Sequence, residues 1–176
     1  QETHYSIFKA SKFYRMKIII IPTSYDGCIR LDILREKIRE NIDKPIILNL
    51  NIGTTVKGAV DNVSGAIGVL EQLLISKNRY YIHCDGALYA MMLPFLEDKN
   101  KPSIDFTLPI DSISVSGHKF IGTPMPCGIF ITRKHLMKPL NTPIEYLNSV
   151  DTTITGSRNA HASLYIWNAL VEKGIS

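Results

Sequence analysis

Two short motifs in this sequence carry side chains that could do chemistry together. Lys119 ends the motif Ser-Gly-His-Lys, which follows an apolar segment. Partial burial beside another cation lowers the pKa of a lysine amine and makes it a nucleophile. Asp85 precedes the small residues Gly86 and Ala87, which leave room for a flat ring near the backbone. A carboxylate at that position can keep a pyridine nitrogen protonated.

A third motif, Gly-Thr-Thr at 53–55, adds hydroxyl groups that could cap a loop or reach the oxygens of a cofactor. The other two motifs also have ordinary structural explanations. Lys119 could lie in a surface loop, and an aspartate after a strand often caps a helix. No motif decides its own function when it is taken alone.

Each of these motifs directly follows an apolar segment that is typical of a buried strand, at 46–53, 80–85 and 112–116. Further strands are predicted at 17–23 and 128–133. Helices are predicted at 5–16, from about Asp32, at 61–77, at 88–96 and at 158–172.

The alternation of these helices with strands that lack a polar face predicts an α/β fold. Its sheet is mostly parallel and sandwiched by helices. In such sheets ligands bind at the carboxyl ends of the strands, where all three motifs are expected.

Composition indicates one soluble globular domain. Of the 176 residues, 45% are hydrophobic and 20% charged. The net charge of +4 comes from scattered side chains, so nucleic acid is not an expected partner.

The apolar runs are shorter than the roughly 20 residues that cross a bilayer, so no membrane-spanning segment is expected. No secretory signal is visible, so a cytoplasmic location is expected. The three cysteines form no paired motif, so we expect reduced thiols and no metal site.

The order of the motifs resembles that of pyridoxal-phosphate-dependent group II amino-acid decarboxylases, the histidine and plant-type serine decarboxylases. The similarity covers nearly the whole chain, in five separate stretches at 3–10, 51–62, 80–95, 114–128 and 145–162. It implies the aspartate-aminotransferase fold, known as fold type I, and pyridoxal 5'-phosphate as the cofactor.

Four residues are assigned to the cofactor ring by this resemblance. His4 would stack on the pyridine ring, and Ala87 would pack on its opposite face. Thr55 would contact the cofactor near its ring oxygen, and Asp85 would pair with the ring nitrogen.

Three more residues are assigned to the rest of the cofactor. Ser116 and His118 would reach the phosphate, and Lys119 would be the Schiff-base lysine. The expected catalytic residues are therefore Lys119, Asp85 and His4.

The resemblance leaves three further residues open. Asp61 matches an acidic position near the family's site, but it could equally cap the helix that starts there. Ser157 and Arg158 match a segment that approaches the active site from a partner subunit in related decarboxylases. They could equally lie at a helix N-terminus, with the arginine on the surface.

The expected reaction is the decarboxylation of an L-amino acid to its amine, with histidine to histamine first and serine to ethanolamine as the alternative. A homodimer or higher homo-oligomer is expected.

The family's pattern also includes an N-terminal glycine-rich phosphate loop and a C-terminal small domain, which this sequence lacks. Residues 1–176 are thus expected to be the central part of the cofactor-binding large domain. A truncated remnant that folds or dimerises without catalysis is the competing hypothesis.

Overall fold

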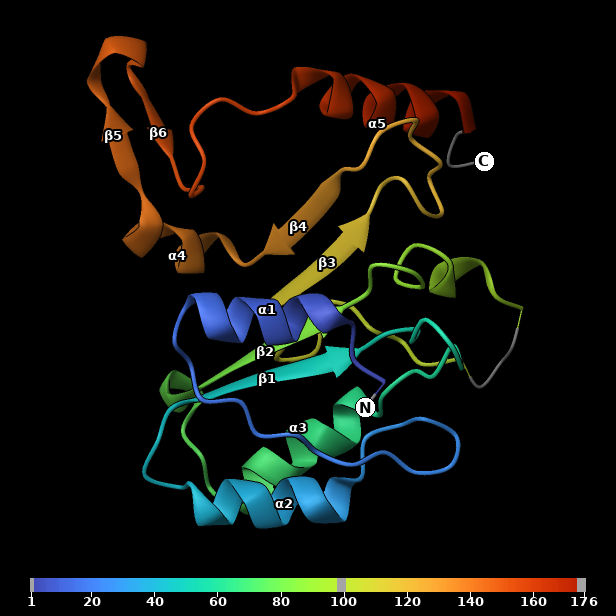
Figure 1. Ribbon diagram of the computed structural model, residues 1–176, viewed down its shortest axis with the longest axis vertical. Helices are drawn as coiled ribbons and strands as arrows, with labels where there is room; N and C mark the ends of the chain where they lie inside the picture. Colours follow the sequence, from blue (N-terminus) through green and yellow to red (C-terminus); the bar gives the residue numbers. More distant parts are fainter. Residues whose placement is uncertain (1, 98–100, 174–176) are drawn as a thin grey trace.

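The computed structural model describes residues 2–97 and 101–173 (Figure 1). A sheet with the strand order β1-β2-β3-β4 forms its centre. The strands are Ile46–Asn51 (β1), Tyr80–Asp85 (β2), Ser112–Ser116 (β3) and Gly128–Thr132 (β4). β1, β2 and β3 run parallel to one another, and β4 pairs antiparallel with β3. The prediction of a mostly parallel α/β sheet is confirmed.

Helices lie on both faces of this sheet, as Figure 1 shows. α2 (Leu31–Glu40) and α3 (Val63–Gln72) lie on one face, and α1 (Tyr5–Phe13) lies on the other. After β4 come α4 (Lys134–Met137), a hairpin of β5 (Thr142–Ile144) and β6 (Ser149–Asp151), and α5 (Ala160–Lys173). Short 3-10 turns occupy Lys77–Arg79, Leu93–Phe95, Lys138–Leu140 and Glu145–Leu147.

The hydrophobic core lies between the sheet and α3, and α2 contributes Leu34 and Ile38 to it. Leu50, Ile82 and Leu70 are fully buried there. α3 begins after Asn62, whose side chain accepts a hydrogen bond from the Gly65 N–H at 2.8 Å. This cap satisfies one of the free donors at the helix N-terminus and fixes where the helix begins.

The opposite face of the sheet is polar, which corrects the expectation that the strands lack a polar face. Side chains alternate along a strand, so every second residue of β1, β2 and β3 points away from the core. The polar residues at these positions are Asn49, Asn51, His83, Asp85, Ser112, Ser114 and Ser116. The alternation is hard to see in the sequence because large apolar residues make each strand look continuously hydrophobic.

Several predicted elements differ in the structure. The strand expected at 17–23 is wrong: Ile18, Ile19 and Ile20 are exposed, and the segment forms only an isolated bridge from Thr23 to Ile29. The helix expected at 88–96 is a series of turns ending in Leu93–Phe95. Hydrophobicity predicts burial, but it does not supply the neighbouring strand that a β-segment must pair with.

The β5–β6 hairpin and α4 were not predicted from the sequence. α5 was predicted at 158–172 and begins two residues later. Within the described ranges, no helix has both the length and the apolar character that crossing a membrane requires.

The first prediction concerns the buried face of β1. Leu50→Ala should lower the free energy of unfolding by about 3 kcal/mol, because it removes a fully buried side chain and leaves a cavity. Ile47→Ala is the matched control on the same strand, since Ile47 is 65% exposed. Its cost should stay below about 1 kcal/mol. Urea unfolding of both variants measures the difference, and equal costs would contradict the assignment of the two faces.

The polar face also contains a half-buried histidine. The Nδ1 atom of His83 lies 2.7 Å from the Ser112 hydroxyl, and Ser112 itself is fully buried. The imidazole ring also lies 6.1 Å from the Phe130 ring, centroid to centroid. Burial lowers the pKa of His83 below its usual 6.5, and the nearby negative charge of Asp85 opposes this shift in part.

The second prediction follows from this lowered pKa. Below about pH 6.5 the unfolded chain binds a proton at His83 that the folded chain does not yet bind, so stability falls as the pH falls. The loss is at most about 1.4 kcal/mol per pH unit for one group. In urea unfolding at about pH 7 and about pH 5.5, His83→Gln should lose less stability on acidification than the wild type. The control His135→Gln, which removes an exposed histidine, should follow the wild type.

Candidate active site

A pocket of about 600 Å³ lies at the carboxyl edge of the sheet, on its polar face. The N-terminal end of α1 forms one wall, and the loops after β1, β2 and β3 form the others. All seven residues assigned to the cofactor line this pocket: His4, Thr55, Asp85, Ala87, Ser116, His118 and Lys119. The structure thus brings together residues that are up to 115 positions apart in the sequence, from His4 to Lys119.

Asp85 is the last residue of β2, and local hydrogen bonds hold its carboxylate. Its Oδ1 atom accepts hydrogen bonds from the Ala87 N–H at 3.2 Å and from the Ser114 hydroxyl at 3.3 Å. Among the described residues, none donates a hydrogen bond to Oδ2. The carboxylate is therefore fixed through one oxygen, while the other can accept a hydrogen bond from a ligand in the pocket.

The Ser-Gly-His-Lys motif forms a tight turn after β3. The Gly117 N–H donates to the Cys127 carbonyl oxygen at 3.0 Å, and a Cβ at Gly117 would lie 2.5 Å from the Cys127 sulfur. A larger residue at position 117 would have to displace the Cys127 side chain. The Nδ1 atom of His118 lies 3.2 Å from the Cys127 N–H and 3.3 Å from its carbonyl oxygen. With Nδ1 held against Cys127, Nε2 is the ring nitrogen available to a ligand.

Lys119 reaches the pocket from the end of this turn, where its N–H donates to the Ser116 carbonyl oxygen at 3.1 Å. The partial burial expected for Lys119 is not found, because its side chain is exposed. His4 and His118 beside it are also exposed. The described residues form the floor and walls of the pocket but leave this side open to solvent.

His4 is the N-cap residue of α1. Its Nδ1 atom accepts a hydrogen bond from the Ser6 N–H at 3.3 Å, and its ring lies 4.2 Å from the ring of Tyr5. The cap satisfies a free helix donor and places the imidazole at the end of the helix that faces the pocket. Its expected stacking on a cofactor ring stays a prediction.

The two threonines after β1 have different roles. Thr54 is buried, and its hydroxyl accepts a hydrogen bond from the Ala59 N–H at 3.0 Å, which closes the loop 53–59. Thr55 is exposed and its side chain lines the pocket. Both threonines line the pocket, but the first is buried and also closes the loop, whereas the second is exposed.

Several residues that line the pocket were not predicted from the sequence. Asn51, His83, Ser114 and Phe130 all line the pocket from the polar face of the sheet. The signal that could have found His83 and Ser114 is strand alternation, because each lies two residues before a predicted site residue on the same strand. Phe130 lies on β4, opposite Ser114, and only the antiparallel pairing brings it to the site.

Asp61 neither caps a helix nor lines this pocket, so the helix-cap alternative is wrong. Its carboxylate accepts hydrogen bonds from the backbone N–H groups of Ile29 and Asn51, both at 2.7 Å. Burial raises the pKa of Asp61, and these hydrogen bonds oppose the shift. Because Asn51 lines the pocket, Asp61 supports the site from behind the strand end.

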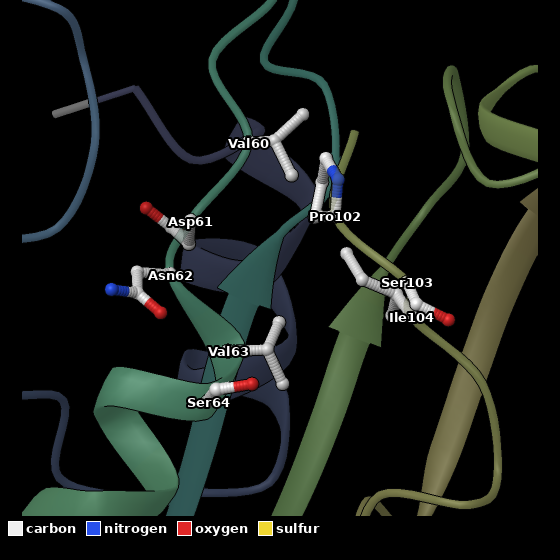
Figure 2. Close-up of a pocket in the computed structure, with 8 residues that line it drawn as sticks. All are labelled: Val60, Asp61, Asn62, Val63, Ser64, Pro102, Ser103 and Ile104. Carbon is white, nitrogen blue, oxygen red and sulfur yellow. The ribbon is translucent and has the colours of Figure 1, made fainter. Parts of the chain in front are cut away.

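A smaller pocket of about 320 Å³ lies between the start of α3 and residues 102–104 (Figure 2). Asp61 borders it, but Figure 2 shows the carboxylate turned away from Ser103 and Ile104. The hydrogen bonds of this carboxylate to Ile29 and Asn51 agree with that direction. This second pocket contains none of the seven residues assigned to the cofactor.

Ser157 and Arg158 do not line the larger pocket. Arg158 forms an ion pair with Asp151 and donates to the carbonyl oxygens of Thr155 and Gly156. Within this chain the arginine therefore holds its own loop together. Its predicted approach to the site of a partner subunit stays a prediction. In the parts of the chain that the structure describes, no group of His, Cys, Asp or Glu side chains could hold a metal ion.

Comparison with solved structures finds the same fold. L-methionine decarboxylase from Streptomyces sp. 590 superposes with a TM-score of 0.82 at 25% identity, over 98% of this chain and 49% of that one. A sphingosine-1-phosphate lyase from Burkholderia pseudomallei superposes with a TM-score of 0.81 at 21% identity, over 99% of this chain and 40% of that one. These likenesses confirm the predicted fold type I architecture.

Curated relatives are considerably more similar in sequence. Serine decarboxylase 2 from rice is 52% identical over 98% of this chain, which spans 36% of the rice protein. Histidine decarboxylase from tomato is 48% identical over 99% of this chain, which spans 41% of that protein. The chain thus spans less than half the length of these relatives.

A family model described as the pyridoxal-dependent decarboxylase conserved domain matches residues 1–176, the whole of this chain. The cofactor of this family is pyridoxal phosphate, as the resemblance implied. The polar pocket, the fold and the two sets of relatives all agree with this match. The chain belongs to the pyridoxal-dependent decarboxylase family.

Proposed function

We propose that the protein decarboxylates an L-amino acid to the corresponding amine and carbon dioxide, with pyridoxal phosphate as cofactor. The observation that supports this most directly is the pocket at the carboxyl edge of the sheet. It combines an amine (Lys119), a carboxylate with one oxygen free of partners among the described residues (Asp85) and two imidazoles (His4 and His118). The reaction replaces the carboxylate on the substrate Cα with a proton.

The pocket fits pyridoxal phosphate in size and in chemistry. A volume of about 600 Å³ lies within the range of cofactor pockets. His118 and Ser116 lie together at the turn after β3 and offer donors for a phosphate group. Asp85 lies on the sheet below them and offers an acceptor for a protonated ring nitrogen. Half-buried Ala87 contributes only a methyl group, which suits the face of a flat ring.

In this proposal each residue has one task. Lys119 would hold the cofactor covalently through its amine, and Asp85 Oδ2 would accept a hydrogen bond from the protonated ring nitrogen and keep it protonated. His4 and Ala87 would lie on opposite faces of the ring, and Thr55 would contact it near its ring oxygen. When bound, pyridoxal phosphate supplies the electron sink for the pair left by the breaking Cα–carboxylate bond. The negative charge of Asp85 stabilises the protonated ring nitrogen that makes this sink effective.

The proposed substrate is histidine or serine. Histidine was the first expectation from the sequence, and histidine decarboxylases from tomato and Klebsiella aerogenes are 48% and 42% identical to this chain. The serine alternative is favoured by serine decarboxylases from rice at 49–52% identity. The homodimer, the cytoplasmic location and the placement of this chain in the centre of a longer large domain stay predictions alongside this proposal.

Product analysis tests the proposal and separates the two substrates. The intact protein is incubated with pyridoxal phosphate and a mixture of L-amino acids, and the amine formed is identified by mass spectrometry. Histamine or ethanolamine is the expected product. Lys119→Ala should form no amine and lose the visible absorption of the bound cofactor, because it lacks the attachment amine. Lys138→Ala, an exposed lysine outside the pocket, is the control.

Two results would contradict this proposal. The absence of any amine from the wild type would favour the remnant that folds or dimerises without catalysis. A visible absorption band that persists in Lys119→Ala would place the attachment on another lysine.

A further prediction concerns Asp85. Asp85→Asn should lower turnover about a hundredfold, roughly 3 kcal/mol of transition-state stabilisation, because a neutral amide cannot keep the ring nitrogen protonated. Asp43→Asn is the matched control, since Asp43 is exposed and lies outside the pocket. Turnover is measured with saturating substrate and cofactor. A rate near that of the wild type for Asp85→Asn would overturn its assignment.

A further inference from the structure

Tyr89 connects two of the loops that form the pocket, although it is not one of the residues that line it. It lies four residues after Asp85, in the turn that follows β2. Its side chain is partly buried and packs against the hydrophobic core. From there it reaches the loop 53–59 that follows β1 and presents Thr55 to the pocket.

The contact between Tyr89 and this loop is close at two points. A Cβ atom at Gly53 would lie 2.3 Å from Cγ of the Tyr89 ring, and a Cβ at Gly58 would lie 2.6 Å from its hydroxyl oxygen. Both glycines also have a positive φ, +89° and +63°. No other residue fits at either position without strain and without displacing the tyrosine. The loop backbone therefore rests directly on the aromatic ring.

The loop has its own internal hydrogen bonds, but these do not fix its position relative to β2. The Gly53 and Thr54 N–H groups donate to the Ala59 carbonyl oxygen at 2.9 and 3.0 Å, and the Gly58 N–H donates to the Thr54 carbonyl oxygen at 2.9 Å. These bonds make the loop a compact unit. The Ile52 N–H, just before the loop, donates to the Asp85 carbonyl oxygen at 2.8 Å and joins the two strand ends, and beyond this bond the ring of Tyr89 lies against the loop.

The turn that carries Tyr89 is itself held firmly against the sheet. The Gly86 N–H donates to the Ser114 carbonyl oxygen of β3 at 3.0 Å, and the Ala90 N–H donates to the Gly86 carbonyl oxygen at 3.1 Å. A Cβ at Gly86 would lie 2.3 Å from the Cβ of Ala90, so this turn has no spare space. Asp85, Ala87 and Tyr89 thus belong to one rigid segment.

We propose that Tyr89 is a positioning residue that sets the separation between Thr55 and the Asp85–Ala87 segment. It does so by resting on Gly53 and Gly58. The inference rests on the proposed function, because this separation matters when one cofactor must contact both segments. A displacement of site residues by about 1 Å can lower activity a hundredfold. Residues that hold the loops of the site in place therefore affect its activity. Ring atoms make the contact at Gly53, whereas the hydroxyl oxygen makes the closest contact at Gly58, so the ring supplies the larger part of this support.

The test compares three variants of the intact protein. Tyr89→Leu keeps an apolar side chain against the core but removes the ring from the glycines, and Tyr89→Phe keeps the ring. Tyr80→Leu is the matched control, because Tyr80 is also partly buried against the core but lies at the opposite end of β2, outside the pocket. Two quantities are measured: the dissociation constant for pyridoxal phosphate, and the rate of tryptic cleavage after Lys57 in the cofactor-free protein.

Tyr89→Leu should bind the cofactor about tenfold more weakly than the wild type, because Thr55 is no longer held in place. Cleavage after Lys57 should be faster in this variant, since exposed Lys57 lies in the loop that the ring supports. Tyr89→Phe keeps the ring against Gly53, so in both measurements it should lie closer to the wild type than Tyr89→Leu does. Tyr80→Leu should leave both unchanged even if it lowers the unfolding free energy.

Three results would overturn the inference. Wild-type affinity and wild-type cleavage in Tyr89→Leu would show that the loop holds its position without the ring. Equal effects of Tyr89→Leu and Tyr80→Leu would show a general loss of stability instead of positioning. A wild-type protein that binds no pyridoxal phosphate would overturn the proposed function and this inference with it, and the wild-type titration identifies that case separately.

Discussion

The parallel, in-register pairing of β1, β2 and β3 is the constraint on which the pocket depends. Asn51 is paired with Asp85, and Asp85 with Ser114, so these side chains form a row across the polar face. All three strands end at the same edge, and the loops after them meet there. A shift of one residue in β2 would move Asp85 into the core and place Cys84 in the pocket. The hydrophobic side chains of β2 oppose such a shift because Ile82 and Cys84 are fully buried.

The sheet therefore serves stability on one face and ligand contact on the other. Two buried polar groups at this site would be costly without partners: Ser112 on the polar face, and Asp61 in the segment before α3. Ser112 is paired with His83, and Asp61 holds two backbone N–H groups, one of them on Asn51. These bonds offset the loss of hydration and at the same time fix residues that form the floor of the pocket.

Much of the fold could be predicted because helix and strand periodicity are local properties. β1, β2, β3, β4 and the starts of α2 and α5 lie within two residues of their predicted positions. The prediction of a strand at 17–23 was wrong because an apolar run indicates burial but does not specify a pairing partner. The β5–β6 hairpin was missed because its short strands carry no clear alternation. The polar face was missed for a related reason: asparagine, histidine and serine alternate with large apolar residues that dominated the interpretation.

By itself the sequence determined the family, the α/β class and the seven residues that gather around the pocket, because motif order and strand ends are written along the chain. Only the tertiary structure decided which neighbours act with them. Asn51, His83 and Phe130 join the site through strand pairing, and Tyr89 supports it by resting on Gly53 and Gly58. Such contacts depend on register and on the packing of loops that are distant in sequence. Their physical origin is the close packing of the folded chain, which no local pattern encodes.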